Sequence, residues 1–199
     1  MFVRARGLQP YLNIYEEMKT FTIERDETTP DEIWLLEHPA VYTQGQAGKP
    51  EHILNPSDIP IVQSDRGGQV TFHGPGQLVI YVLFDLKRRK LGIKDLVCQL
   101  ERVIVSLLAS FNIKAETQCG APGVYIDQKK IASIGLRVKN GCTYHGIALN
   151  VAMDLTPFKG INPCGYERLE MTQLKNYVNN ITIADVQKLM TPSLIEQFG

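Results

Sequence analysis

The sequence predicts an α+β fold with a mixed or antiparallel sheet flanked by helices. Helical patterns gather near the two ends of the chain and in one long central segment, and consecutive strand patterns fill the regions between them. The 199 residues are 44% hydrophobic and 21% charged, which is typical of a globular domain and excludes disordered, collagen-like and coiled-coil classes. No internal repeat or linker divides the sequence, so we expect a single domain over residues 1–199.

The first elements follow from hydrophobic periodicity. Residues 10–24 repeat apolar side chains at helical spacing, and Pro10 suits a first helical turn. Residues 32–37 predict a strand, and residues 43–60, with three prolines and two glycines, predict a long loop of the kind that is often functional. The segment 61–86 is rich in strand patterns. Its nearly continuous apolar run from Gln77 to Phe84 predicts a central strand covered on both faces.

The second half of the chain predicts one long helix, a hairpin and a helical end. An apolar stripe from Leu96 to Phe111 predicts the helix. The β-rich runs 123–127 and 130–138, separated by a short polar turn, predict the hairpin. Thr182 is a typical cap for a helix over 183–190, and Thr191–Pro192 indicates the start of a separate last helix.

A further strand pattern runs from Thr143 to Met153. Its residues alternate between two faces. Small and partly polar side chains lie on one face, and we expect them to let a ligand or a neighbouring backbone come close. The face with the small and partly polar side chains carries Tyr144, Gly146, Ala148 and Asn150. The opposite face carries His145, Ile147, Leu149 and Val151.

Charge and composition limit the partners of the chain. Lys plus Arg total 21 and Asp plus Glu total 21, so no net charge attracts nucleic acid or an anionic membrane. No apolar run is long enough for a secretory signal or a membrane helix, and we expect a cytoplasmic protein. The four cysteines form no C-x-x-C pair, which indicates reduced thiols.

The densest chemical signal is the segment Arg66–Gln77, RGGQVTFHGPGQ. Four glycines and a proline weaken a strand, so this backbone needs special dihedral angles or close approach to a ligand. The alternative is a glycine-bulged hairpin with one surface histidine. No glycine-rich phosphate-binding motif occurs in the sequence. His38 and His52 precede or lie in loops, where we expect surface imidazoles.

Cys164 lies in an irregular turn rather than on a periodic apolar face. Pro163 restricts the backbone before it and Gly165 frees the backbone after it. A cysteine held in this way is a candidate nucleophile, and the alternative is a loop bystander. Cys142 and His145 could suggest zinc, but without a second ligand pair we expect no metal.

Lys129 and Lys130 begin an otherwise apolar strand. The usual interpretation is a solvated strand end. If Lys130 instead points inward beside Cys164, its ammonium would favour the thiolate, and the neutral amine could move protons.

These segments together, in this order, resemble the octanoyltransferase family, also called lipoyl(octanoyl) transferases, which start protein lipoylation. Phe72 stands where many members carry a tyrosine, which removes one hydroxyl contact. The matching pieces lie between about residues 31 and 175. They are Asp31–Thr43, Arg66–Gln77, Lys130–Arg137, Cys142–Asn150, Met153–Leu155 and Ile161–Tyr166.

The resemblance implies a fold like that of biotin and lipoate protein ligases. It also implies that Cys164 is the nucleophile that forms an acyl thioester and that Lys130 is the residue that activates it. The implied acyl-binding residues come from three segments. They are Arg66, Gly67, Gly68, Gln69, Val70, Thr71, Phe72 and His73, then Ser133, Ile134 and Gly135, and finally Gly146, Ile147 and Ala148.

The implied reaction moves octanoyl from octanoyl-acyl carrier protein to a lysine of an acceptor protein. The implied acceptors are lipoyl domains of 2-oxoacid dehydrogenases and the glycine-cleavage H protein. A thioester is already activated, so no ATP or other cofactor is expected. Two alternatives stay open at this stage. One is an ATP-dependent lipoate or biotin protein ligase-like enzyme, and the other is a catalytically silent module that binds acyl chains.

Overall fold

A seven-stranded mixed sheet forms the centre of the protein in the computed structural model, which describes residues 1–167 and 169–199. Only the β1–β2 pair of this sheet is parallel, and the other neighbours are antiparallel. The strand order is β1 (Phe2–Leu8), β2 (Glu32–Glu37), β6 (Gln77–Leu83), β10 (Cys142–Asn150), β9 (Lys129–Lys139), β8 (Gly123–Ile126) and β7 (Glu116–Thr117).

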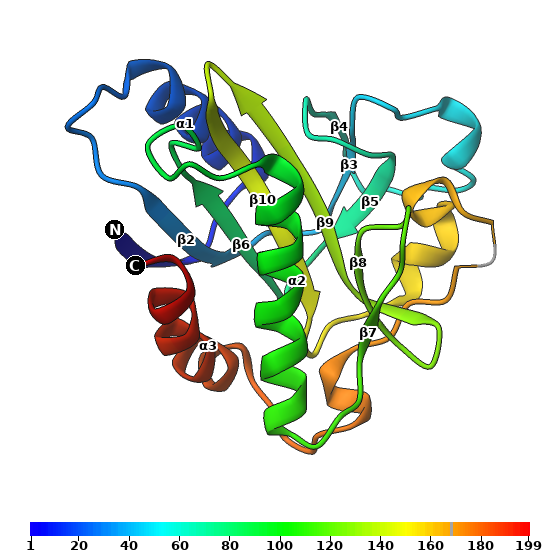
Figure 1. Cartoon of the computed structure of the whole chain (residues 1–199). Coiled ribbons are helices and arrows are strands. Elements are labelled where there is room, and N and C mark those ends of the chain that lie inside the picture. Colours follow the sequence, from blue (N-terminus) through cyan, green and yellow to red (C-terminus); the bar gives the residue numbers. More distant parts are fainter. Residues whose placement is uncertain (168) are drawn as a thin grey trace.

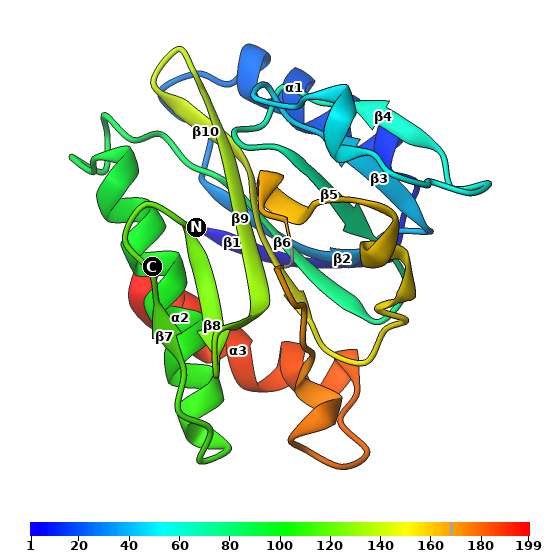
Figure 2. The same ribbon diagram turned by 90° about the vertical axis from the view of Figure 1, so that its right-hand side faces the viewer.

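A smaller sheet and three α-helices cover the large sheet. The small sheet has the order β4 (Ile61–Gln63), β3 (Val41–Gln44) and β5 (Val70–His73). Figures 1 and 2 show the large sheet between two layers, with α2 and α3 on one side and α1 with the small sheet on the other. The α-helices are α1 (Tyr11–Glu24), α2 (Ile93–Ser110) and α3 (Ile183–Phe198). This arrangement confirms the predicted α+β class with a mixed sheet and flanking helices.

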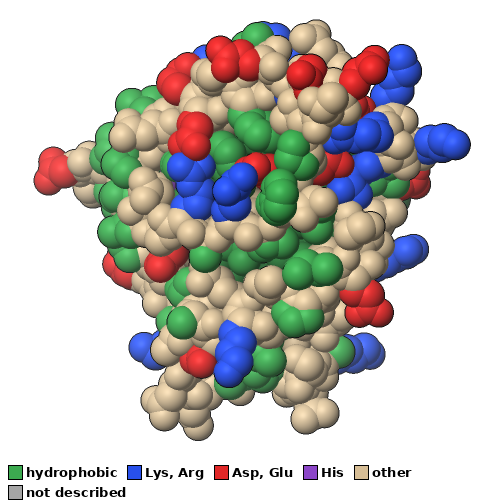
Figure 3. Space-filling view, turned by 90° about the vertical axis from the view of Figure 1, so that its left-hand side faces the viewer, with side chains coloured by type: hydrophobic (Ala, Val, Ile, Leu, Met, Phe, Trp, Pro, Cys, Tyr) green, Lys and Arg blue, Asp and Glu red, His purple; other side chains and the backbone are tan. Residues whose placement is uncertain are grey.

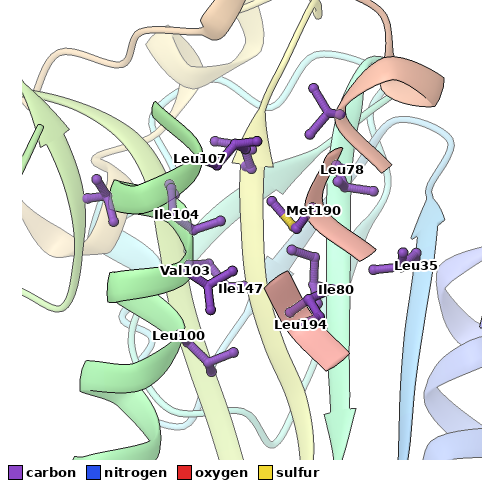
Figure 4. Packing of buried hydrophobic residues seen from close by; sticks show 14 of the residues in the cluster. Leu35, Leu78, Ile80, Leu100, Val103, Ile104, Leu107, Ile147, Met190 and Leu194 are labelled. Carbon is purple, nitrogen blue, oxygen red and sulfur yellow. The ribbon is translucent and has the colours of Figure 1, made fainter. Parts of the chain in front are cut away.

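Packing on the two faces explains why these helices form. The apolar stripe of α2 lies against the sheet and against α3, and Figure 4 shows its side chains meeting Ile147 and Ile80 of the strands and Met190 and Leu194 of α3. On the other face, α1 buries its own stripe against β2, β6 and β10. The apolar run of β6 is buried along its whole length, as expected for a strand covered on both faces.

The C-terminal region differs from the prediction of two helices. One helix, α3, runs continuously from Ile183 to Phe198 with Pro192 inside it. A proline in a helix interior costs about 3 kcal/mol. The stripe of Val186, Met190, Leu194 and Phe198 is buried in the core, and each such side chain contributes about 1.5–3 kcal/mol. Burial therefore outweighs the loss of one backbone hydrogen bond.

The predicted alternation of β10 fails at His145. Its φ of 61° lies in the left-handed region, which rotates the side chain away from the face that carries Ile147. His145 stacks instead on Tyr15 of α1 and lies beside Tyr81 and Tyr144. A non-glycine residue in this region is strained, and such strain is commonly found at functional sites.

The outer surface on the side of β1 and the two termini carries apolar side chains between groups of acidic and basic ones (Figure 3). Phe2 and Leu8 of the edge strand β1 are more than half exposed. No helix within residues 1–167 and 169–199 is long and apolar enough to cross a membrane.

A buried carboxylate joins three parts of the fold away from these surfaces. Asp31, at the start of β2, accepts hydrogen bonds from Arg25 after α1 and from Arg88 and Arg89 after β6. Arg89 also donates to the carbonyl of Phe198 at the end of α3. Burial alone would raise the pKa of Asp31, but the Asp85 amide and the arginines outweigh it, so the pKa is lowered.

We expect Asp31→Asn to lower the free energy of unfolding by about 3 kcal/mol, because it leaves the enclosed Arg25 guanidinium without its anion. Urea denaturation at neutral pH measures this loss, with the exposed Glu24→Gln as the matched control. Because the folded pKa is lowered, the contribution is present at neutral pH and is lost as the pH falls below about 3.9. Equal stability of the two variants at pH 7 would contradict this role of Asp31.

Candidate active site

A cavity of about 440 Å³ opens where the small sheet meets β9 and β10. Fourteen of the sixteen predicted site residues line it. They are Arg66, Gly67, Gly68, Gln69, Thr71, His73, Lys130, Ser133, Ile134, Gly135, Gly146, Ile147, Ala148 and Cys164. Its volume falls in the usual range for small-ligand pockets. Segments far apart in the sequence therefore meet at one place.

The two predicted residues that do not line the cavity are Val70 and Phe72. Successive side chains of a strand point to opposite faces, so Thr71 and His73 of β5 line the cavity while Val70 and Phe72 pack beneath the small sheet with Phe158 and Ile161. These two residues support the binding segment but lie outside the cavity wall. Every second residue of β5 therefore faces the cavity.

Cys164 lies in a strained turn, the short 3₁₀ segment Pro163–Gly165. Its φ is 58° and that of Gly165 is 78°. The turn is held by the Gly165 amide, which donates to the Asn162 carbonyl at 3.0 Å, and by the Asn162 amide, which donates to the His52 carbonyl at 2.8 Å. A side chain at position 165 would approach Gln69 at 3.0 Å. The turn thus holds the sulfur at the cavity through fixed backbone geometry.

Lys130 donates from Nζ to the Sγ of Cys164 at 3.3 Å. Its side chain is 1% exposed, whereas Lys129 is exposed and pairs with Glu170 on the surface. The strand pleat therefore separates the two lysines, and Lys130 takes the inward position that would activate a thiol. The lysine lies over the ring of Tyr125, with Nζ 5.3 Å from the ring centre.

The electrostatics of Lys130 depend on the thiol. Burial alone would lower the pKa of Lys130, but the negative charge of Cys164, followed by Tyr125, outweighs burial and raises it. The sulfur of Cys164 therefore stabilises the buried Lys130 ammonium. Such a pair of nucleophile and acid/base group can run acyl transfer.

Two glycines near the cavity, Gly45 and Gly135, lie against the Arg66 side chain. Its guanidinium is buried and donates to the side-chain and backbone oxygens of Thr43 and to the carbonyl of Gly67. A Cβ at position 45 would lie 2.3 Å from the Gly68 carbonyl oxygen and 2.8 Å from Nη1 of this arginine. One at Gly135 would lie 3.0 Å from the Gly67 carbonyl oxygen and 3.2 Å from Cδ of the arginine. Burial lowers the pKa of Arg66. These glycines therefore make room for the arginine.

At Gly146, the neighbouring strand β6 leaves no room for a side chain. A Cβ on this residue of β10 would collide with the carbonyl oxygen of Ile80 on β6. The glycine thus permits close pairing of the two strands beside the distorted His145. The predicted open space for a ligand comes instead from Ala148 and Ser133, which pair across β10 and β9 and both line the cavity.

The inner end of the cavity is polar but holds its histidines neutral. His73 donates from Nδ1 to the Oε1 of Gln77, whose amide nitrogen is committed to the Phe72 carbonyl and to Asn150. Its Nε2 then accepts from the Thr43 hydroxyl. Burial, with positively charged neighbours, lowers the pKa of His73 to about 3. A neutral imidazole can border an acyl chain at far smaller desolvation cost than a charged one.

His38 is a correction to the sequence analysis, which expected a surface imidazole. The residue is completely buried. Its Nδ1 donates to the Gln9 carbonyl, and its Nε2 accepts from the Tyr81 hydroxyl. Burial lowers the pKa of His38 to about 4. The loop position was misleading, because the His38 ring is buried between Tyr11 of α1 and Tyr81 of β6, although Pro39 and Ala40 of the same loop are exposed. His52 is half-buried beside the Cys164 turn.

Asp65, which precedes the predicted Arg66 segment, holds the strained part of β10. Its carboxylate accepts hydrogen bonds from the Tyr144 hydroxyl and from Nε2 of His145 at 3.0 Å. Burial would raise the pKa of Asp65, but these hydrogen bonds outweigh it and the pKa is lowered. Burial lowers the pKa of His145 despite the carboxylate. Nothing in the sequence pattern indicated this contact.

The comparisons with known proteins agree with this geometry. A model of the "Lipoyl protein ligase A/B catalytic domain" matches residues 10–195. The chain belongs to this family. A relative from Legionella pneumophila (strain Paris), named Octanoyltransferase, is 60% identical over 198 residues and is covered completely, as is this chain.

Solved structures with low sequence identity show the family fold. A bi-partite lipoate protein ligase from Thermoplasma acidophilum matches 98% of this chain and 84% of its own, with a TM-score of 0.71 at 15% identity. Biotin protein ligase from Aquifex aeolicus matches 99% of this chain and 69% of its own, with a TM-score of 0.59 at 13% identity. The predicted family and its biotin/lipoate protein ligase-like fold are therefore confirmed.

Several residues of this family member's cavity were not predicted from its sequence. Tyr11 of α1, Val79 and Tyr81 of β6 and Val97 of α2 all line it. Each belongs to an apolar periodic pattern that the sequence analysis assigned to core packing, so no signal separated them from core residues. Within the described part of the chain, no group of three His, Cys, Asp or Glu side chains is placed to hold a metal ion.

We expect Lys130→Ala to move the pH profile of Cys164 alkylation upward by about 1 to 3 pH units, because the thiolate loses a cation 3.3 Å away. The rate of iodoacetamide labelling of this thiol, followed by peptide mass analysis, measures the shift. Lys129→Ala, one residue away and exposed, is the matched control and keeps the wild-type profile. If Lys130→Ala also keeps it, Lys130 does not stabilise the thiolate.

Proposed function

We propose that this chain is an octanoyltransferase that works through a thioester on Cys164. The observation that carries the proposal is the buried Lys130 ammonium 3.3 Å from the Cys164 sulfur, at the wall of a largely apolar cavity. The name of the Legionella relative, at 60% identity over the full chain, supports the same activity. The prediction made from the sequence agrees with both.

In the first half of the reaction, the Cys164 thiolate attacks the carbonyl carbon of an octanoyl thioester on acyl carrier protein. The bond from carbon to the carrier sulfur breaks, and the carrier thiolate takes a proton from the Lys130 ammonium. The octanoyl group then stays on Cys164 as a thioester. Lys130 is left as a neutral amine inside the site.

In the second half, the ε-amine of an acceptor lysine attacks the Cys164 thioester. Neutral Lys130 takes a proton from the attacking nitrogen, and Cys164 leaves as a thiolate beside the new ammonium. An amide forms from a thioester, which is downhill. The reaction therefore needs no ATP and no cofactor.

The cavity binds the acyl chain by burial. Ala148 and Val79 form one wall, and Ile134 and Ile147 of the paired strands β9 and β10 contribute further apolar surface. Each methylene removed from water contributes about 0.8 kcal/mol. We place the binding role on the cavity-lining members of the three predicted segments, with Val70 and Phe72 supporting them from beneath.

The proposed partners follow from the reaction. The donor is octanoyl-acyl carrier protein, and the acceptors are lipoyl domains of 2-oxoacid dehydrogenases and the glycine-cleavage H protein. One solved neighbour, from T. acidophilum, is described with its E2 lipoyl domain, which supports an acceptor of this class. We propose residues 1–199 as one catalytic domain that acts in the cytoplasm without nucleic acid or membrane.

An ATP-dependent ligase is the strongest alternative, because the solved neighbours include ligases. Those neighbours are 13–15% identical and show the fold alone. A ligase activates its acid as an adenylate and has no need for a cysteine beside a buried lysine. Transfer from an octanoyl thioester without ATP distinguishes the two activities, and a silent binding module would retain the chain without transferring it.

We expect Cys164→Ser to abolish transfer while the fold is kept, because a serine alkoxide is far less available than a thiolate at pH 7. The measurement is the mass of an acceptor lipoyl domain after incubation with octanoyl-acyl carrier protein. Cys119→Ser, at an exposed cysteine, is the matched control and retains activity. Near-normal transfer by Cys164→Ser would overturn the assignment of the nucleophile.

We expect Ala148→Leu to weaken octanoyl transfer more than hexanoyl transfer. Overpacking a close-packed site typically costs about 1–3 kcal/mol, or about 5- to 150-fold in binding, and a shorter chain avoids part of that cost. The ratio of transfer efficiencies for hexanoyl and octanoyl donors measures the change, with the exposed Ala109→Leu on α2 as the matched control. An unchanged ratio in the folded Ala148→Leu variant would place the chain elsewhere.

A further inference from the structure

The side chain of Lys130 occupies space that Gly123 leaves open. Gly123 begins β8, the strand beside β9. A Cβ at this position would lie 2.5 Å from the Cε of Lys130, 3.3 Å from its Nζ and 2.5 Å from the carbonyl oxygen of Ala132 on β9. A contact below 3.0 Å requires one of the two groups to shift, and the flexible end of the Lys130 side chain shifts more readily than the β9 backbone. A side chain at position 123 would therefore displace the ammonium.

The pairing of β8 with β9 also directs Lys130. Val124 pairs with Ala132, and Tyr125 pairs with Lys130, so Ile131 is an extra residue in β9. A bulge of this kind bends the strand and changes the direction of the neighbouring side chain. The bulge lies directly between Lys130 and the part of β9 that continues the cavity wall. The inward direction of Lys130 thus depends on how β8 sits beside β9.

A buried carboxylate holds the start of β8 in this position. Glu101 lies on α2 among residues of its apolar stripe and is 8% exposed. Its Oε1 accepts a hydrogen bond from the amide of Gly123 at 2.9 Å. A carboxylate among apolar side chains is costly, and a neutral acceptor or an apolar side chain would suffice for packing alone. The carboxylate thus contacts a residue that borders the Lys130 side chain.

We propose that Gly123 and Glu101 are positioning residues for Lys130. Gly123 leaves room for the ammonium, and Glu101, through the Gly123 amide, holds β8 where that room exists. This inference rests on the proposed function, because it concerns the lysine that pairs with Cys164. Neither residue touches the cysteine, so each acts through Lys130.

The test compares the pH profile of Cys164 alkylation among folded variants with wild-type circular dichroism. Gly123→Ala is expected to move the profile upward by about 1 pH unit, in the same direction as Lys130→Ala. Gly141→Ala is the matched control, because it is also a glycine with positive φ but has open space around its Cβ. In the Lys130→Ala background, Gly123→Ala is expected to add no shift, because the displaced group is gone.

Glu101 provides a second pair of variants should Gly123→Ala fail to fold. Glu101→Leu removes the acceptor and is expected to move the alkylation profile upward. Glu101→Gln keeps an acceptor oxygen and is expected to restore the wild-type profile. A purely structural role would lower thermal stability in both variants without moving either profile.

Three results would overturn the inference. The first is a wild-type alkylation profile for folded Gly123→Ala or Glu101→Leu. The second is a shift from Gly123→Ala that is equal in the presence and in the absence of Lys130. The third is a profile of Glu101→Gln that matches that of Glu101→Leu. If Lys130→Ala itself causes no shift, the Cys164–Lys130 pair of the proposed function fails. If Lys130→Ala shifts the profile and the positioning variants do not, only the present inference fails.

Discussion

The contact between the Lys130 ammonium and the Cys164 sulfur is the interaction on which the rest of the site depends. Burying an ammonium is costly unless a group that can carry negative charge accompanies it, and the Cys164 sulfur at 3.3 Å is such a group. The fold holds Lys130 from two sides, since β8 pairs with it on one edge and the carbonyl of Glu170 accepts from its amide on the other. The turn that carries Cys164 follows β10 in the chain, and backbone hydrogen bonds of Asn162 and Gly165 hold it beside Lys130. The pair therefore forms only when two distant parts of the sequence are folded together.

The remainder of the cavity keeps its polar groups from competing with this pair. His73 and His38 stay neutral at physiological pH because burial depresses their pKa values. The Arg66 guanidinium donates hydrogen bonds to oxygens of Thr43 and Gly67. The Asp65 carboxylate accepts hydrogen bonds from Tyr144 and His145. Each of these four side chains thus has a partner within the protein, and Lys130 is the group placed to exchange a proton with Cys164.

The sequence predicted most of the fold because long apolar patterns decide the elements. The stripe of α2 and the apolar run of β6 were recognised, and both form the core. Contacts that arise only in three dimensions could not be predicted. His38 was expected to be exposed because it follows a strand, yet its ring is buried between α1 and β6. Pro192 was expected to begin a helix, yet the buried stripe of α3 continues through it. Of the glycines in Arg66–Gln77, which were predicted to need special dihedral angles or close approach, Gly68 and Gly76 have positive φ. Only the structure shows that Gly45 and Gly135 lie against Arg66 and that Gly146 lies against a neighbouring strand.

The central claim is that the octanoyl group passes through Cys164, and stepwise mass analysis of the protein tests it most directly. The chain is mixed with octanoyl-acyl carrier protein alone, freed of the donor, and then given an acceptor lipoyl domain without ATP. We expect one added octanoyl group, located on the peptide that contains Cys164, and its loss as the acceptor gains the same mass. An acceptor that is octanoylated only with donor present, while the chain never carries the group, would contradict it.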